Sequence, residues 1–191
     1  MISREFIKWI LPEFDWIENP ELREACVSTW METAKKAHHT EASLLKVLFA
    51  DTGLENCPVT LIEHTRLVTK TAVELAKQFN AAYAPQVKAD MDLVTAGALL
   101  HDVGKAYESF AEDPDGALAD ETAYVRHPFL GAAIARDCGC PWQVSYIINN
   151  HSFEGDDSRS FPEMFLVRRA DTMHFEYLFY GYERRRIFKN G

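Results

Sequence analysis

The sequence predicts an all-α fold: a single compact helical bundle with extra helices at its N-terminus. Along several segments, apolar residues recur at spacings of three and four, as they do on one face of an α-helix. No convincing run alternates between apolar and polar residues, which is the pattern typical of strands. With 191 residues, 47% of them hydrophobic, the chain is long enough for one well-filled domain and short for two.

We expect residues 1–58 to form an N-terminal helical extension packed on the core, and residues 59–191 to form the main helical domain. Pro20 and Pro128 suit the first turn of a helix, since proline is tolerated there. An acidic loop with a tight turn is expected over residues 113–116. The expected helices cover residues 4–11, 20–39, 60–80 and 87–101, a segment beginning at Pro128, and residues 141–151 and 162–186.

Composition restricts the partners. The net charge of −9 argues against a nucleic-acid polymer, because phosphate backbones are bound by clustered Lys and Arg. The basic residues 184–186 are interpreted as the end of the last helix. No segment is apolar enough to cross a membrane, and charges interrupt residues 1–8 too early for a signal peptide, so we expect a cytoplasmic protein. The four cysteines fit a reducing compartment and are interpreted as core or incidental thiols.

One motif organises the chain, the run Ala-Gly-Ala-Leu-Leu-His-Asp-Val-Gly-Lys at residues 96–105. It reads as a buried helix that ends at Gly104, just after the adjacent ligand-type residues His101 and Asp102. In isolation, such a pair is better explained by a hydrogen bond between its members and a cap on the helix. A metal site requires partners elsewhere in the chain.

The chain supplies those partners on other expected helices. His64 lies on an apolar stripe, His127 lies beside a helix start, His151 ends a helix, and Asp171 occupies an apolar face, where burying it unpaired would be expensive. Each has a structural explanation alone, but together with His101 and Asp102 they favour a metal centre. Imidazoles with carboxylates suit divalent Fe, Mn, Zn, Co or Ni, and six ligands suit two ions that share one carboxylate.

The pattern His64, His101-Asp102 and Asp171, with the phrase at residues 100–105, resembles the HD-domain metal-dependent phosphohydrolase superfamily. The further pair, His127 and His151, resembles its dinuclear members, which include small bacterial hydrolases of dinucleoside polyphosphates and the HD-GYP proteins. The resemblance covers about residues 60–180 and lacks the Gly-Tyr-Pro element, which disfavours cyclic-dinucleotide hydrolysis. It implies that one metal is held by His64, His101, Asp102 and Asp171, and that Asp102 bridges to a second held by His127 and His151.

The expected function is hydrolysis of a phosphate ester or anhydride of a small nucleotide-like substrate by a metal-activated hydroxide. Asp102 and Lys105 are the expected catalytic residues, and Lys105 and Arg168 the expected phosphate contacts, although Arg168 also suits a surface role. Fe or Mn is the expected metal, with Zn, Co, Ni or Mg as alternatives. Two other functions stay open: a mixed-valent di-iron oxygenase of the HD fold, and a non-catalytic module that senses nucleotides or metals. The sequence specifies no oligomeric state.

Overall fold

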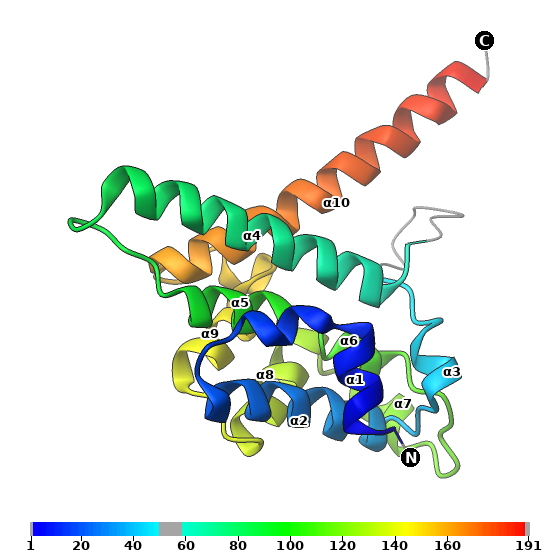
Figure 1. Ribbon diagram of the computed structural model, residues 1–191. Helices are drawn as coiled ribbons and strands as arrows, with labels where there is room; N and C mark the ends of the chain where they lie inside the picture. Colours follow the sequence, from blue (N-terminus) through cyan, green and yellow to red (C-terminus); the bar gives the residue numbers. More distant parts are fainter. Residues whose placement is uncertain (1, 50–58, 190–191) are drawn as a thin grey trace.

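A computed structural model describes residues 2–49 and 59–189, with side chains through residue 182. Its architecture is an all-α bundle, as predicted (Figure 1). Within the described residues, the only β pairing is one isolated bridge between Leu48 and Thr60. The elements are α1 (Arg4–Ile10), η1 (Pro12–Trp16), α2 (Pro20–Lys36), α3 (Glu41–Leu44), α4 (Leu61–Tyr83), α5 (Met91–Leu100), α6 (Lys105–Glu108), α7 (Ala117–Thr122), α8 (His127–Asp137), α9 (Trp142–Asn150), η2 (Phe153–Gly155) and α10 (Pro162–Lys189).

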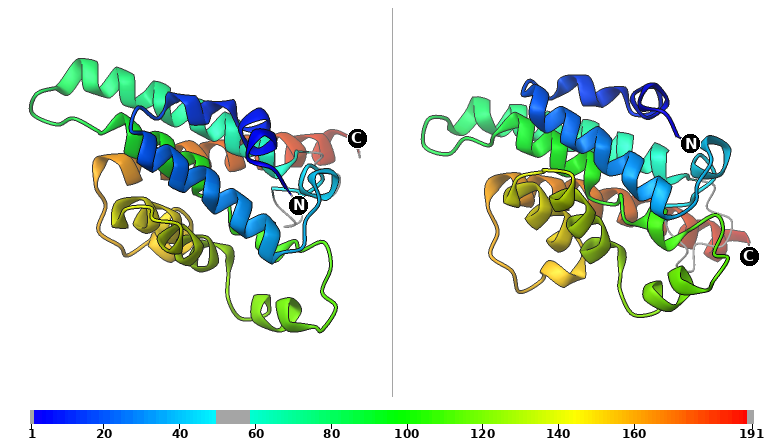
Figure 2. Two further views of the ribbon diagram at one scale, coloured as in Figure 1. Left: turned by 60° about the horizontal axis from the view of Figure 1, so that its bottom comes forward. Right: turned by 90° about the horizontal axis from the view of Figure 1, so that it is seen from below.

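Helix α5 lies at the centre of the bundle because its sequence is apolar on all sides. Every residue from Val94 to Leu100 is buried. Helices α4 and α10 pack on α5 and on each other, α9 packs on another side, and α2 contacts both α5 and α8. In Figure 1 the C-terminal part of α10 extends beyond the bundle, and Figure 2 shows α7 set apart on its connecting loops.

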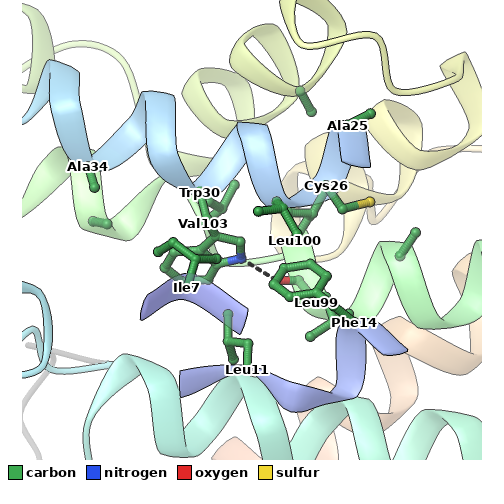
Figure 3. Close-up of a cluster of buried hydrophobic side chains, with 14 of the residues drawn as sticks. Ile7, Leu11, Phe14, Ala25, Cys26, Trp30, Ala34, Leu99, Leu100 and Val103 are labelled. Atoms are coloured by element: carbon green, nitrogen blue, oxygen red, sulfur yellow. Dashed lines mark hydrogen bonds between the residues drawn. The ribbon is translucent and has the colours of Figure 1, made fainter. Parts of the chain in front are cut away.

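The N-terminal helices share one hydrophobic core with α5 and α9. Ile7, Leu11, Phe14 and Trp30 are completely buried and belong to the same cluster as residues 99, 100 and 103 (Figure 3). The indole Nε1 of Trp30 donates to the carbonyl oxygen of residue 99 at 3.0 Å, in the last turn of α5. The N-terminal segment therefore supports α5 directly, and it also reaches α4, where Glu13 pairs with Arg66 and Lys70.

Helix α4 shows how local sequence sets an element. Thr60 and Glu63 form a capping box: the Thr60 hydroxyl accepts the Glu63 backbone N–H, and the Glu63 carboxylate accepts the Thr60 backbone N–H. The buried residues of α4 run from Leu61 to Ala76, whereas Phe79 is 42% exposed, because α4 extends beyond the helices that cover it. The helix also ends at Tyr83, one turn later than predicted.

Helix α5 is shorter at both ends than predicted. It begins at Met91 rather than residue 87, because the Asp90 side chain accepts the N–H groups of residues 92 and 93 and fixes the start there. It ends at Leu100 rather than at Gly104. The φ of Gly104 is −64°, so the glycine is not needed for a left-handed turn. It is needed for close packing, since a Cβ there would lie 2.1 Å from the carbonyl oxygen of His127.

Several smaller expectations have outcomes here. Cys26 and Cys140 are buried free thiols and Cys138 is a half-buried one, as predicted, whereas Cys57 lies outside the described residues. The side chains of residues 184–186 and the predicted domain boundary at residue 58 also lie outside the described residues. His39, at the end of the expected helix over residues 20–39, lies beyond the end of α2 and is buried, with Nε2 2.7 Å from the Ala106 carbonyl oxygen. Among the described helices, none has the length and apolar content that a membrane span requires.

Candidate metal centre

The bundle brings six ligand-type side chains together from five places in the sequence. Five of the six are almost fully buried, and Asp171 is partly exposed. They are His64 on α4, His101 and Asp102 in the turn after α5, His127 at the first residue of α8, His151 just after α9, and Asp171 on α10. All six residues predicted to be ligands therefore converge at one place.

The first group comprises His64, His101, Asp102 and Asp171, whose ligand atoms all lie within 4.8 Å of one another. His64 Nε2 lies 3.1 Å from Asp171 Oδ1 and 3.4 Å from Asp102 Oδ2. The Nε2 atoms of His64 and His101 are only 3.3 Å apart. Two imidazole nitrogens that face each other beside two carboxylates are arranged as around a cation, because bare lone pairs this close would repel.

The second group comprises Asp102, His127 and His151. The Nε2 atoms of both histidines lie 3.2 Å from Asp102 Oδ1. Asp102 thus belongs to both groups: its Oδ2 faces the first and its Oδ1 faces the second.

Two buried atoms of the second group are left without hydrogen bonds. Asp102 Oδ1 and His127 Nε2 have no partner of suitable geometry among the described residues. Buried polar atoms are normally satisfied, and each exception needs an explanation. A divalent cation explains this one, because it would take the carboxylate oxygen and the ring nitrogen together. The residues present therefore fit a metal.

The rings are oriented by hydrogen bonds at their other nitrogen. His101 Nδ1 lies 2.7 Å from the Ala98 carbonyl oxygen, and His151 Nδ1 lies 2.7 Å from the Ile148 carbonyl oxygen. A carbonyl oxygen can only accept, so Nδ1 carries the proton and donates it. In the neutral ring this leaves the Nε2 lone pair directed at the cluster, which is the form that binds metals.

The carboxylates are held ionised. Burial raises the pKa of Asp102, but the Lys105 ammonium and the His101 imidazole outweigh it and hold that pKa well below its usual range. Lys105 Nζ lies 2.7 Å from Asp102 Oδ2. Burial likewise raises the pKa of Asp171, and the bond from His64 together with the nearby His101 lowers it to about 2. The carboxylates of Asp102 and Asp171 are therefore both negatively charged at neutral pH.

The imidazoles divide into two kinds. Burial lowers the pKa of His64 and His151, and the neighbouring carboxylates offset this only in part, so these rings are neutral at neutral pH. Burial also lowers the pKa of His101 and His127, but Asp102 beside both rings outweighs it, and their pKa values are raised. Each group thus contains one imidazole whose pKa is lowered and one whose pKa is raised.

The centre opens into a pocket of about 660 Å³ that carries cations and aromatic rings. Lys105 lies at its base. Arg126 and Arg168 lie at its mouth, and both are held by the loop that contains η2: Arg126 stacks on Phe153 at 4.2 Å and pairs with Glu154, and Arg168 pairs with Asp156 and donates to the Gly155 carbonyl oxygen at 2.8 Å. Arg168 therefore lines the pocket as a partner of Asp156, which also lines it.

Sequence reasoning missed four residues of this site. Glu108 contacts the His127 ring, Phe49 stacks on the His64 ring with centroids 4.5 Å apart, and Arg126 and Phe153 line the mouth. Phe49 and Glu108 lie outside any periodic helical pattern, so no local signal marked them. Arg126 directly precedes a candidate ligand, and that position was the one available signal.

The chain resembles known proteins over part of its length. The HD domain family matches residues 61–176. The dihydroneopterin 2',3'-cyclic phosphate phosphodiesterase of Methanocaldococcus jannaschii is 34% identical over 115 residues, which are 58% of this chain and 44% of that protein. The tRNA (cytidine(56)-2'-O)-methyltransferase of Thermoplasma volcanium is 29% identical over 136 residues, 66% of this chain and 34% of that protein. The chain thus spans less than half of either relative. No solved structure gives a significant match.

Proposed function

This chain belongs to the HD-domain family, and from that premise we propose that it is a metal-dependent phosphohydrolase with a dinuclear centre, acting on a phosphate ester or anhydride of a nucleotide-like substrate. The observation that carries the proposal is the position of Asp102. Its two oxygens face two separate groups of imidazoles, and the same cluster opens into a pocket with three cationic side chains. A single-ion site would have no use for the second group.

HD domains bind divalent metals, and the buried clusters of this chain suit them. We assign one ion to His64, His101, Asp102 and Asp171, and a second to Asp102, His127 and His151. The mixed imidazole and carboxylate set favours Fe or Mn, with Zn, Co, Ni or Mg as alternatives. When bound, such a pair of ions supplies an activated water as the nucleophile and neutralises charge on the phosphoryl oxygens.

The chain's own cations would bind and orient the phosphate. The Lys105 side chain is 21% exposed, and its ammonium lies between Asp102 and the pocket. From there it can contact a phosphoryl oxygen while still balancing the charge of Asp102. Arg126 and Arg168 stand farther out, where a substrate anion would compete with Glu154 and Asp156 for their guanidinium groups.

The aromatic lining supports a substrate that carries a flat ring. Phe153 is 61% exposed and Phe175 also lines the pocket. Exposed aromatic rings stack on bases and other heterocycles. The relative from M. jannaschii is named for a cyclic phosphate of dihydroneopterin, a heterocyclic compound, which agrees with this lining. The net charge of −9 favours a small substrate over the tRNA named for the other relative.

The test is metal analysis of protein purified without added metal, followed by a substrate panel with and without oxygen. The panel contains nucleoside 2',3'-cyclic phosphates, nucleoside polyphosphates and nucleoside monophosphates. We expect about two ions per chain and phosphate-bond cleavage that is independent of oxygen. A His151→Ala variant purified in the same way controls for contaminating phosphatases. Oxygen consumption coupled to substrate loss without phosphate-bond cleavage would replace this proposal with the oxygenase, and bound metal without turnover of any compound would favour the sensing module.

A further inference from the structure

Glu108 holds one of the candidate ligands at two points. It is the last residue of α6, one turn after Lys105. Its Oε1 accepts the backbone N–H of His127 at 2.5 Å, and its Oε2 lies 3.2 Å from Nδ1 of the same residue. A carboxylate can only accept, and His127 Nδ1 is therefore the donor.

Two other rings of the cluster are oriented by their own chain segments. His101 and His151 each follow the last turn of a helix, and each bonds the carbonyl three residues earlier in its own chain segment. His127 is instead the first residue of α8, where no earlier helical carbonyl is available. A side chain 19 residues away in the sequence takes the place of that carbonyl.

We propose that Glu108 is a positioning residue for the second metal ion: it fixes the Nδ1–H tautomer of His127 and directs Nε2 at Asp102 Oδ1. The inference rests on the proposed dinuclear function. Because Glu108 contacts none of the four residues of the first group directly in the described structure, its effect is confined to the second ion. Removing a carboxylate that orients a histidine ligand typically weakens metal binding by about 10- to 100-fold.

The experiment measures metal binding in the absence of substrate. Chelator-treated protein is titrated with Mn²⁺ by calorimetry, and the electron paramagnetic resonance signal of a coupled Mn pair is recorded. We compare wild type, Glu108→Ala, Glu108→Gln and, as a matched control, Glu154→Gln, since Glu154 is an acidic side chain that pairs with the pocket residue Arg126 instead of a candidate ligand.

We expect Glu108→Ala to bind the second Mn²⁺ about 10- to 100-fold more weakly and to lose the coupled signal, with the first affinity within about 2-fold of wild type. Glu108→Gln should recover part of the affinity, because its amide oxygen still accepts the Nδ1–H. Glu154→Gln should bind both ions as wild type does. A merely structural role would instead lower the melting temperature and leave the second affinity of the folded protein unchanged.

The proposal is overturned if Glu108→Ala binds two ions with wild-type affinities, or if both affinities fall equally. If Glu108→Ala does not fold, Glu108→Asp takes its place, because its shorter side chain cannot reach both nitrogen atoms of His127. Failure of the proposed function is distinguishable, since the wild-type protein itself would then bind fewer than two ions.

Discussion

Gly104→Ala is expected to disrupt the centre without changing the side chain of any candidate ligand. The added Cβ would lie 2.1 Å from the carbonyl oxygen and 2.8 Å from the carbonyl carbon of His127, and 2.9 Å from the backbone nitrogen of Gly131. All three are backbone atoms, so no rotamer change can relieve the contact. Cβ atoms essentially never approach other heavy atoms closer than 3.0 Å, so the His127 carbonyl must move by at least about 0.9 Å.

The cost follows from that displacement. Overpacking lowers the free energy of unfolding by about 1–3 kcal/mol. Because the added Cβ of Gly104→Ala meets backbone atoms, which cannot move aside easily, we expect a loss of about 3 kcal/mol. For a chain of this size, that is a fall in melting temperature of about 6–12 °C. Since His127 moves with the start of α8, we also expect the second ion to bind more weakly and phosphate-bond cleavage to fall by about 100-fold.

Thermal melting followed by circular dichroism and Mn²⁺ titration measure these effects. Gly181→Ala is the matched control: Gly181 lies in α10 and its added Cβ meets nothing within 4 Å. Helix propensity should make that variant more stable by about 0.5–1 kcal/mol. A Gly104→Ala protein that melts like wild type and binds two ions equally tightly would refute the reasoning.

Three further outcomes are expected. Lys105→Ala should lower kcat/KM by about 100- to 1,000-fold with metal content unchanged, because it removes a cation directed at the phosphate, and loss of metal instead would contradict that role. With chelator present, the free energy of unfolding of Asp171→Asn at pH 5 should be about 2 kcal/mol lower than that of wild type. The reason is that the Asp171 pKa falls from 3.8 to about 2 on folding. This contribution is present above the unfolded pKa and lost as pH falls toward 2, so urea unfolding at pH 3 should show a smaller difference. Trp30→Phe should destabilise the protein by about 2–4 kcal/mol in urea unfolding, since it leaves the carbonyl of residue 99 unpaired in the core, and a loss under 1 kcal/mol would contradict this.

The sequence was most informative where one segment carried its own signals. Helix α4 has a capping box at Thr60 and Glu63 and an apolar stripe, so both its start and its buried face followed from local pattern. His64 and Asp171 stood out because each is a polar residue where a hydrophobe is expected. Their convergence could be proposed because independent helices carried the same anomaly.

The features that were missed depend on contacts between distant segments. The role of Gly104 comes from its approach to α8, and its local sequence resembles a helix stop. Glu108 is defined by a contact with a residue 19 positions later. His39 bonds the carbonyl oxygen of Ala106 in α6, 67 positions later. None of these contacts has a period or a spacing that the sequence displays.

The N-terminal segment that packs on α5 limits how far the chain can be shortened. The family match begins at residue 61, yet Trp30 bonds the end of α5, and the Asp92 carboxylate of α5 accepts the backbone N–H groups of Glu18 and Asn19 at 2.7 and 2.8 Å. A chain shortened to the matched residues would leave the far side of its central helix, including Leu99, exposed to water. The residues that match the family therefore leave out the segment that covers this side of the helix leading to the histidine–aspartate pair.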